Sequence, residues 1–191
     1  TAVGFNAGAS VTTGVSNTLI GGQAGDALTD ADLNVALGNM ALSSDTLGGL
    51  STAIGYQALK TQNFSSATTS YNTAVGYNSG VLVTTGTQNT LIGYGSGTAL
   101  TDADFNTVLG TNALASDTQG SKSTAIGTQA LNTQNFSSAT DSHNTAVGYQ
   151  AGLNVTTGIQ NTIVGSLAGD ALTDADRNTV LGFQALTTDT Q

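Results

Sequence analysis

A short run of β-favouring residues, closed by glycine, returns along the whole chain. The run reads Asn or Ser, then Thr, then a small or aliphatic residue, then Val, Ile or Leu, then Gly. Two variable residues, an Ala or Ser and a polar stretch follow it each time. Such a run followed by Gly indicates a strand that ends in a turn, and no helical period of 3.6 residues passes through these segments. The pattern therefore predicts one short strand in each repeat.

The spacing of these runs predicts a solenoid. From Asn72 they begin at Asn72, Asn89, Asn106 and Ser123, and the next begins at Asn144, so the coils have 17, 17, 17 and 21 residues within a super-repeat of 72. Because one coil buries almost nothing while stacked coils share side-chain ladders about 4.8 Å apart, we expect an all-β parallel β-solenoid or β-roll of about eleven coils.

The whole chain is expected to be one repeat-built unit. Residues 1–191 divide into super-repeats 1–71, 72–143 and 144–191, and both ends fall inside a coil, which is typical of a fragment of a longer chain.

The fifth position of every coil is glycine, which indicates a backbone bend or a close approach that a Cβ would obstruct. These expected turn glycines are Gly4, Gly21, Gly38, Gly55, Gly76, Gly93, Gly110, Gly127, Gly148, Gly165 and Gly182. Gly120 and its counterpart Gly48 lie in the variable polar stretch, where we expect a surface turn that accepts a side chain.

Both faces of the repeated strand are apolar, because the third and fourth positions are apolar in every coil and point to opposite sides. One face then fills the coil, and the other is expected to pack against identical chains, with a homotrimer as the preferred assembly. If the fourth-position aliphatic column is the core, the second-position Thr column is turned inward beside it, which argues against an ice-binding surface.

The run at 144–152, Asn-Thr-Ala-Val-Gly-Tyr-Gln-Ala-Gly, resembles the head repeats of trimeric autotransporter adhesins, as do residues 51–55 and 123–127. It is equally similar to the repeat regions of phage tail-fibre proteins. The adhesin resemblance implies a trimer of left-handed parallel β-rolls, and the tail-fibre resemblance implies a trimeric shaft. The coils of 17 and 21 residues are longer than those of the adhesins.

Composition excludes several functions. The chain has 3 Lys or Arg against 12 Asp, a net charge of −9, no Cys, and only 8% charged residues. Without a basic face, nucleic-acid binding is not expected. Without a run of about 18 apolar residues, membrane insertion is not expected either. No cofactor is expected, and no Cys or His cluster suggests a metal.

Three features of the sequence are candidates for a chemical role. Asp141, Ser142 and His143 are of the residue types found in hydrolytic triads, but three adjacent residues cannot converge on one another, so no enzyme activity is expected. Thr-Asp-Ala-Asp recurs at 29–32, 101–104 and 173–176 and has the oxygen ligands that Ca²⁺ takes, but solvated turn carboxylates are favoured.

The four extra residues of the 21-residue coil fall within 61–68 and 133–140, where Phe64 and Phe136 either tuck under the loop or mark a contact site.

These observations favour a structural shaft or adhesive segment of an extracellular or virion fibre, with a phage tail fibre preferred. A bacterial surface adhesin or self-assembling filament is the alternative, and an ice- or calcium-binding solenoid is less favoured. The expected partner is a further copy of the chain, with a host cell-surface receptor recognised by other parts of the protein. The expected location is extracellular or the virion surface.

Overall fold

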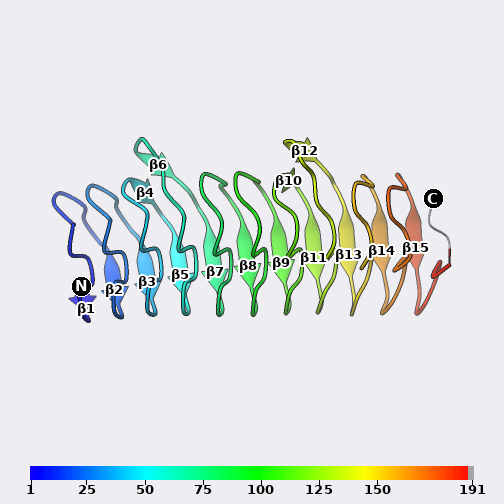
Figure 1. Cartoon of the computed structure of the whole chain (residues 1–191), viewed down its shortest axis with the longest axis horizontal. Coiled ribbons are helices and arrows are strands. Elements are labelled where there is room, and N and C mark those ends of the chain that lie inside the picture. Colours follow the sequence, from blue (N-terminus) through cyan, green and yellow to red (C-terminus); the bar gives the residue numbers. More distant parts are fainter. Residues whose placement is uncertain (189–191) are drawn as a thin grey trace.

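The computed structural model describes residues 1–188 and is an all-β parallel solenoid of eleven coils (Figure 1). Residues 189–191, the end of the third super-repeat, lie outside the described residues. The coils stack along one axis into a rod, which the chain climbs one coil at a time from the first strand to the last. Residues 1–188 contain no helix, and so none long and apolar enough to cross a membrane.

Each coil contributes one strand to the main sheet, at the predicted run. The strands are β1 (Ala2–Val3), β2 (Thr18–Ile20), β3 (Val35–Leu37), β5 (Thr52–Ile54), β7 (Thr73–Val75), β8 (Thr90–Ile92), β9 (Thr107–Leu109), β11 (Thr124–Ile126), β13 (Thr145–Val147), β14 (Thr162–Val164) and β15 (Thr179–Leu181). Their order in the sheet is their order in the chain, and every pairing is parallel.

Two small sheets form beside the long coils. β4 (Gly48–Gly49) pairs with β6 (Thr68–Thr69), and β10 (Gly120–Ser121) pairs with β12 (Thr140–Asp141). The inserted residues around β6 and β12 project from the side of the rod in Figure 1, and we call segments 63–69 and 135–141 the first and second overhang. The insertion predicted for the 21-residue coil is therefore a lateral loop.

The strands pair in a register that stacks equivalent positions. Thr90 pairs with both Thr73 and Thr107, and Leu91 lies between the two corresponding third-position residues. Backbone bonds between coils continue outside the strands, as from the Gly25 N–H to the Ala41 carbonyl at 2.9 Å. Because the coils are bonded in their turns as well as in the sheet, side chains at one coil position form straight ladders along the rod.

The third position of the strand fills the interior, and the fourth does not. Leu91, Val108 and Ile163 are fully buried, whereas the fourth-position Leu109 is 47% exposed. The fourth-position aliphatic column is therefore not the core of the coil. Third-position and eighth-position side chains meet inside the coil. Many of them can be Ala because larger side chains from other positions of the coil fill the remaining volume.

The fifth-position glycines combine both features that the sequence suggested. Their φ angles lie between 127° and 142°, a region that residues with a side chain rarely adopt. A Cβ on Gly110 would lie 2.5 Å from the carbonyl oxygen of Gly127 in the next coil. Each such glycine from Gly4 to Gly165 meets the next one in this way, so the column is a line of backbone contacts.

The first-position Asn side chains form a buried ladder that bonds to the backbone. Asn89 Oδ1 accepts the backbone N–H of Asn106 at 2.9 Å, and its Nδ2 donates to the Ala103 carbonyl at 2.7 Å. The same pair of bonds recurs at Asn17, Asn34, Asn72, Asn106, Asn144 and Asn161. Each amide of this ladder joins backbone groups of neighbouring coils rather than the next amide of the column.

The interior alternates between two ways of filling the same space. Where the ninth position is Gly, as in Gly97, the twelfth is a buried aliphatic such as Leu100, and a Cβ on Gly97 would lie 2.9 Å from Leu100 Cδ1. In four coils the ninth position is instead a buried Leu and the twelfth is a buried polar residue: Leu42 with Asp45, Leu59 with Gln62, Leu114 with Asp117, and Leu131 with Gln134. A large aliphatic side chain therefore stands at either the ninth or the twelfth position of a coil. Where it stands at the ninth, the twelfth position has room for a buried polar group.

Candidate functional site: the outward strand face

The second and fourth positions of the main sheet point outward and form one continuous surface. We call this surface the Thr/aliphatic face. Its first column is Thr18, Val35, Thr52, Thr73, Thr90, Thr107, Thr124, Thr145, Thr162 and Thr179, and its second is Ile20, Leu37, Ile54, Val75, Ile92, Leu109, Ile126, Val147, Val164 and Leu181. All of these side chains are exposed or half-buried. The Thr column is therefore not turned inward, because the third position forms the core.

The threonine hydroxyls of this face have no hydrogen-bond partner among the described residues. Thr hydroxyls elsewhere bond to neighbouring coils, as Thr84 Oγ1 does to the Thr101 carbonyl at 3.1 Å. The nine Thr side chains of the face make no such bond within residues 1–188. The face also carries no charged residue. It is a chemically uniform strip of unpaired hydroxyls beside branched aliphatic groups.

Aromatic rings line one edge of the Thr/aliphatic face. The sixth position of three successive coils is Tyr56, Tyr77 and Tyr94. Their rings stack on one another, with neighbouring ring centroids 5.1 Å and 5.3 Å apart. Because the rings stack, they cover much of one another's faces and leave mainly their edges to solvent.

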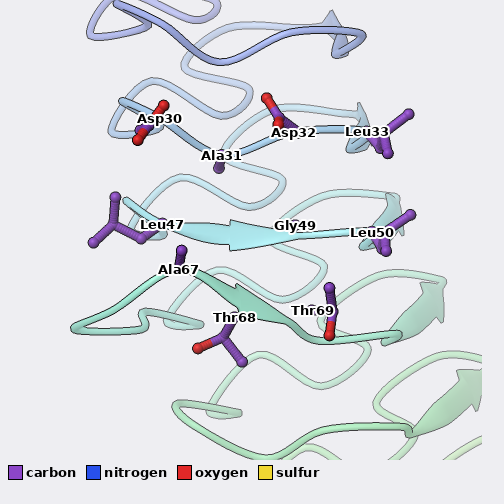
Figure 2. Close-up of a pocket in the computed structure, with 10 residues that line it drawn as sticks. All are labelled: Asp30, Ala31, Asp32, Leu33, Leu47, Gly49, Leu50, Ala67, Thr68 and Thr69. Atoms are coloured by element: carbon purple, nitrogen blue, oxygen red, sulfur yellow. The ribbon is translucent and has the colours of Figure 1, made fainter.

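A groove lies on the far side of the coil, under the first overhang (Figure 2). It has a volume of about 240 Å³, and Asp30, Ala31, Asp32, Leu33, Leu47, Gly49, Leu50, Ala67, Thr68 and Thr69 line it. Figure 2 shows Leu33 and Leu50 one above the other at one side of the small residues Ala31, Gly49 and Ala67. The three residues stacked beside these leucines, Ala31, Gly49 and Ala67, are small.

The corresponding place under the second overhang has different side chains. Lys122 stands where the first copy has Leu50, Asp141 stands where it has Thr69, and these two form an ion pair across the place of the groove. Phe105 replaces Leu33. The side chains that line the groove are thus not repeated in the next super-repeat.

Beneath each overhang lies a buried network of polar side chains. Asp45 Oδ2 accepts a bond from Gln62 Nε2 at 2.6 Å, and its Oδ1 accepts the Gly48 N–H at 2.9 Å. Gln62 Nε2 also donates to Ser51 Oγ at 2.8 Å, and its Oε1 accepts Asn72 Nδ2 at 2.9 Å. Burial raises the pKa of Asp45, and the Gln62 and backbone donors oppose that rise. The groups satisfy one another, which gives the network a structural role.

The network explains why the long coil begins with Ser rather than Asn. The insertion moves away the carbonyl to which a first-position Asn would donate. Ser51 Oγ instead bonds to Ser70 Oγ at 2.5 Å, and Ser123 bonds to Ser142 in the same way. The second copy of the network repeats the bonds of the first, with Asp117, Gln134 and Asn144.

The structure buries both overhang phenylalanines. Phe64 is 5% exposed and Phe136 is 6% exposed. Each ring lies against the backbone of the preceding coil, since a Cβ on Gly48 would approach Phe64 Cδ2 to 2.6 Å. The rings support the loops from beneath and do not present a surface to a ligand.

The expectation for Gly120 is wrong. It is buried in β10, and a Cβ there would lie 2.0 Å from Asp117 Oδ2 and 2.7 Å from Phe136 Cδ2. Gly48 has the same surroundings in the first copy. Both glycines are required by the buried network rather than by a surface turn.

The Thr-Asp-Ala-Asp segments bind neighbouring backbone. Asp32 Oδ1 accepts the Val15 N–H at 2.6 Å, and Asp104 and Asp176 accept the equivalent N–H one super-repeat and two super-repeats later. Among the described residues no three His, Cys, Asp or Glu side chains come together as a metal-binding group. The second Asp of each segment joins its coil to the one before.

Asp141, Ser142 and His143 point to three different surroundings. Asp141 pairs with Lys122, the Ser142 hydroxyl is buried against Ser123, and His143 is exposed. The structure does not bring the three side chains together.

The sequence did not reveal how many residues adopt left-handed backbone. Twenty-five residues other than glycine have φ between 46° and 63°, and they occupy the seventh, ninth and last positions of the coils. At the seventh position Asn and Gln recur, and Asn tolerates this conformation, so a weak signal was present there. At the last position the residue varies from Ser16 to Arg177, and no pattern marks it.

Comparisons with models of protein families, with curated proteins and with solved structures gave no match to this chain.

Proposed function

We propose that this chain is a segment of an extracellular or virion fibre, in which it forms a stiff shaft with one uniform lateral face. The observation that supports the proposal most is the unbroken eleven-strand parallel sheet, in which each coil bonds to both neighbours in strand and turns. At about 4.8 Å for each coil such a rod is about 50 Å long. The length of a rod of this kind follows directly from the number of coils, which suits a spacer.

The interior supports the same role. Asn ladders, glycine contacts and aliphatic ladders repeat at successive levels, so neighbouring coils hold each other and no level depends on a distant one. The resemblance of the Thr-Ala-(Val/Ile)-Gly repeats to phage tail fibres and trimeric autotransporter adhesin heads agrees with a fibre. The chain supplies a scaffold with surface, and the proposed role involves no chemical reaction.

The homotrimer stays a prediction, and the fold changes where it would form. The surface available to further copies is the Thr/aliphatic face, with its half-exposed fourth-position residues, rather than the third-position column. Sedimentation of the purified segment measures the assembly directly.

Two experiments test the fibre proposal. Insertion of a second copy of residues 72–143 after position 143 adds four coils, and the rod seen by electron microscopy should lengthen by about 19 Å at constant width. Immunogold labelling with an antibody against the segment should mark filaments that extend from the source cells or virions. Label confined to the cell interior or to the capsid would overturn the proposal.

A further inference from the structure

The Thr/aliphatic face is a regular two-dimensional array of groups. Along the rod, equivalent side chains are separated by the inter-strand distance of about 4.8 Å. Across the face, the Thr and aliphatic columns are two residues apart on one strand, which is roughly 6.7 Å. In Figure 1 the strands of the main sheet follow one another along the rod in a nearly straight row. Methyl groups therefore repeat at nearly constant intervals over ten successive strands, and hydroxyls on nine of them.

Such an array is suited to water that is already ordered. In liquid water an exposed hydroxyl finds a hydrogen-bond partner wherever it lies, so the regular spacing of the hydroxyls brings no advantage in binding. Rows of water oxygens on the prism faces of ice repeat at an interval close to the inter-strand distance. Thr hydroxyls in register can each occupy or bond to one lattice position, while the Thr methyl and aliphatic groups fit between waters whose hydrogen bonds are made within the lattice.

The face is less suited to the other occupants. It carries no charge with which to hold a charged peptide, a nucleic acid or an acidic lipid surface. Its area, about 50 Å by about 10 Å, is roughly 500 Å², below the roughly 800 Å² that each partner of a standard stable interface buries. A second copy would also bury the free hydroxyls of Thr90, Thr107 and their column, each at a cost unless it finds a partner.

We propose that the Thr/aliphatic face binds the surface of ice, with the Thr hydroxyls and methyl groups in register with lattice waters. This goes beyond the fibre role and does not depend on it, and it is an alternative to the homotrimer on the same face. A fibre with such a face attaches to ice crystals along its length rather than at its tip. Val35, the single departure from Thr in the first column, keeps the branched shape and lacks only the hydroxyl.

The absence of Cys allows the face to be blocked after folding. Thr90→Cys places one thiol at an exposed site on the face, and Thr85→Cys places one at an exposed site in the polar stretch of the preceding coil. Each variant is folded, checked by circular dichroism and sedimentation, and then coupled to a bulky maleimide polymer. Thermal hysteresis and inhibition of ice recrystallisation are measured before and after coupling.

The parent protein and the unmodified Thr85→Cys variant should show thermal hysteresis, and the hysteresis of the unmodified Thr90→Cys variant is the baseline for coupling at position 90. Coupling at position 90 should remove most of it, and coupling at position 85 should leave it nearly unchanged. A folded, monomeric protein without hysteresis at millimolar concentration would overturn the proposal. Equal loss on coupling at both positions would also overturn it. A stable oligomer in which the thiol at position 90 is protected would assign the face to further copies of the chain, and the fibre proposal would stand.

Discussion

The two overhangs have the same interior and different surfaces. Beneath the first, Asp45, Gln62 and Phe64 make the contacts that Asp117, Gln134 and Phe136 make beneath the second. Outside, the first has an open groove where the second has the Lys122–Asp141 ion pair. The lesson is that the buried network requires these residues at both places, whereas the outer lining is free to vary. A function that depends on repetition is therefore to be sought on the strand face, where nine of ten second-position residues of the strands β2 to β15 are Thr.

The largest effect is expected at the glycine column, where the interior tolerates no side chain. Gly21→Val puts a Cβ 2.5 Å from the Gly38 carbonyl oxygen at a φ of 134°, whereas Gly22→Val meets only the Asn39 amide group. We expect Gly21→Val to lower the free energy of unfolding by about 3 kcal/mol or more, because backbone strain adds to the clash. Gly22→Val should change it by roughly 0.5 kcal/mol, since other coils carry larger residues there. Chemical denaturation of both variants decides the matter, and equal loss would mean that the coil register is wrong.

Removal of the central glutamine from each network should have an intermediate effect, equal in the two copies. Gln62→Ala removes the partner of Asp45 Oδ2 and one of the two acceptors of Asn72 Nδ2, and Gln134→Ala does the same to Asp117 and Asn144. Each change is expected to cost about 3 kcal/mol or somewhat less, because buried polar groups lose their hydrogen bonds. Hydrogen exchange of the surrounding amides measures the local loss in each copy. A large cost in one copy with none in the other would contradict the equivalence of the two interiors.

Exchange of the outer lining should have the smallest effect. The double variant Lys122→Leu, Asp141→Thr gives the second overhang residues of the first, and Leu50→Lys, Thr69→Asp is the reverse exchange. Both Lys122 and Asp141 are substantially exposed, at 40% and 54%, so the ion pair is expected to contribute less than about 1 kcal/mol. Thermal melts of the two double variants should lie close to that of the parent. A drop as large as that of Gln134→Ala would show that the lining supports the interior.

The sequence predicted the architecture well because its signal is repeated eleven times. Coil lengths, strand positions, parallel stacking and the glycine contacts all follow from spacing, and the structure agrees with each of them. The orientation of the strand did not follow, because both its faces are apolar and alternation alone does not say which one is inside. The third position can be as small as Ala36 or Ala53 and still line the core, because Leu42 and Leu59 from elsewhere in the same coils fill the space.

The buried network could not be predicted, for a different reason. Asp45 and Gln62 look like ordinary surface residues in a polar stretch, and only the inserted overhang, with Phe64 closing over them, takes them out of water. The expectation for Gly120 is wrong for the same reason. Glycine is required there because a Cβ would meet Asp117 and Phe136, and not because of the backbone conformation of Gly120 itself.

The orientation of the strand is open to one direct measurement. The chain has no Cys, so Thr90→Cys and Leu91→Cys differ only in the side of the sheet on which a single thiol lies. Leu91 is 0% exposed, and Thr90 is exposed. In the native protein a small maleimide should react rapidly with the thiol at position 90, and with the thiol at position 91 only after denaturation. Rapid reaction at position 91 with protection at position 90 would contradict the outward Thr/aliphatic face and the functions proposed for it.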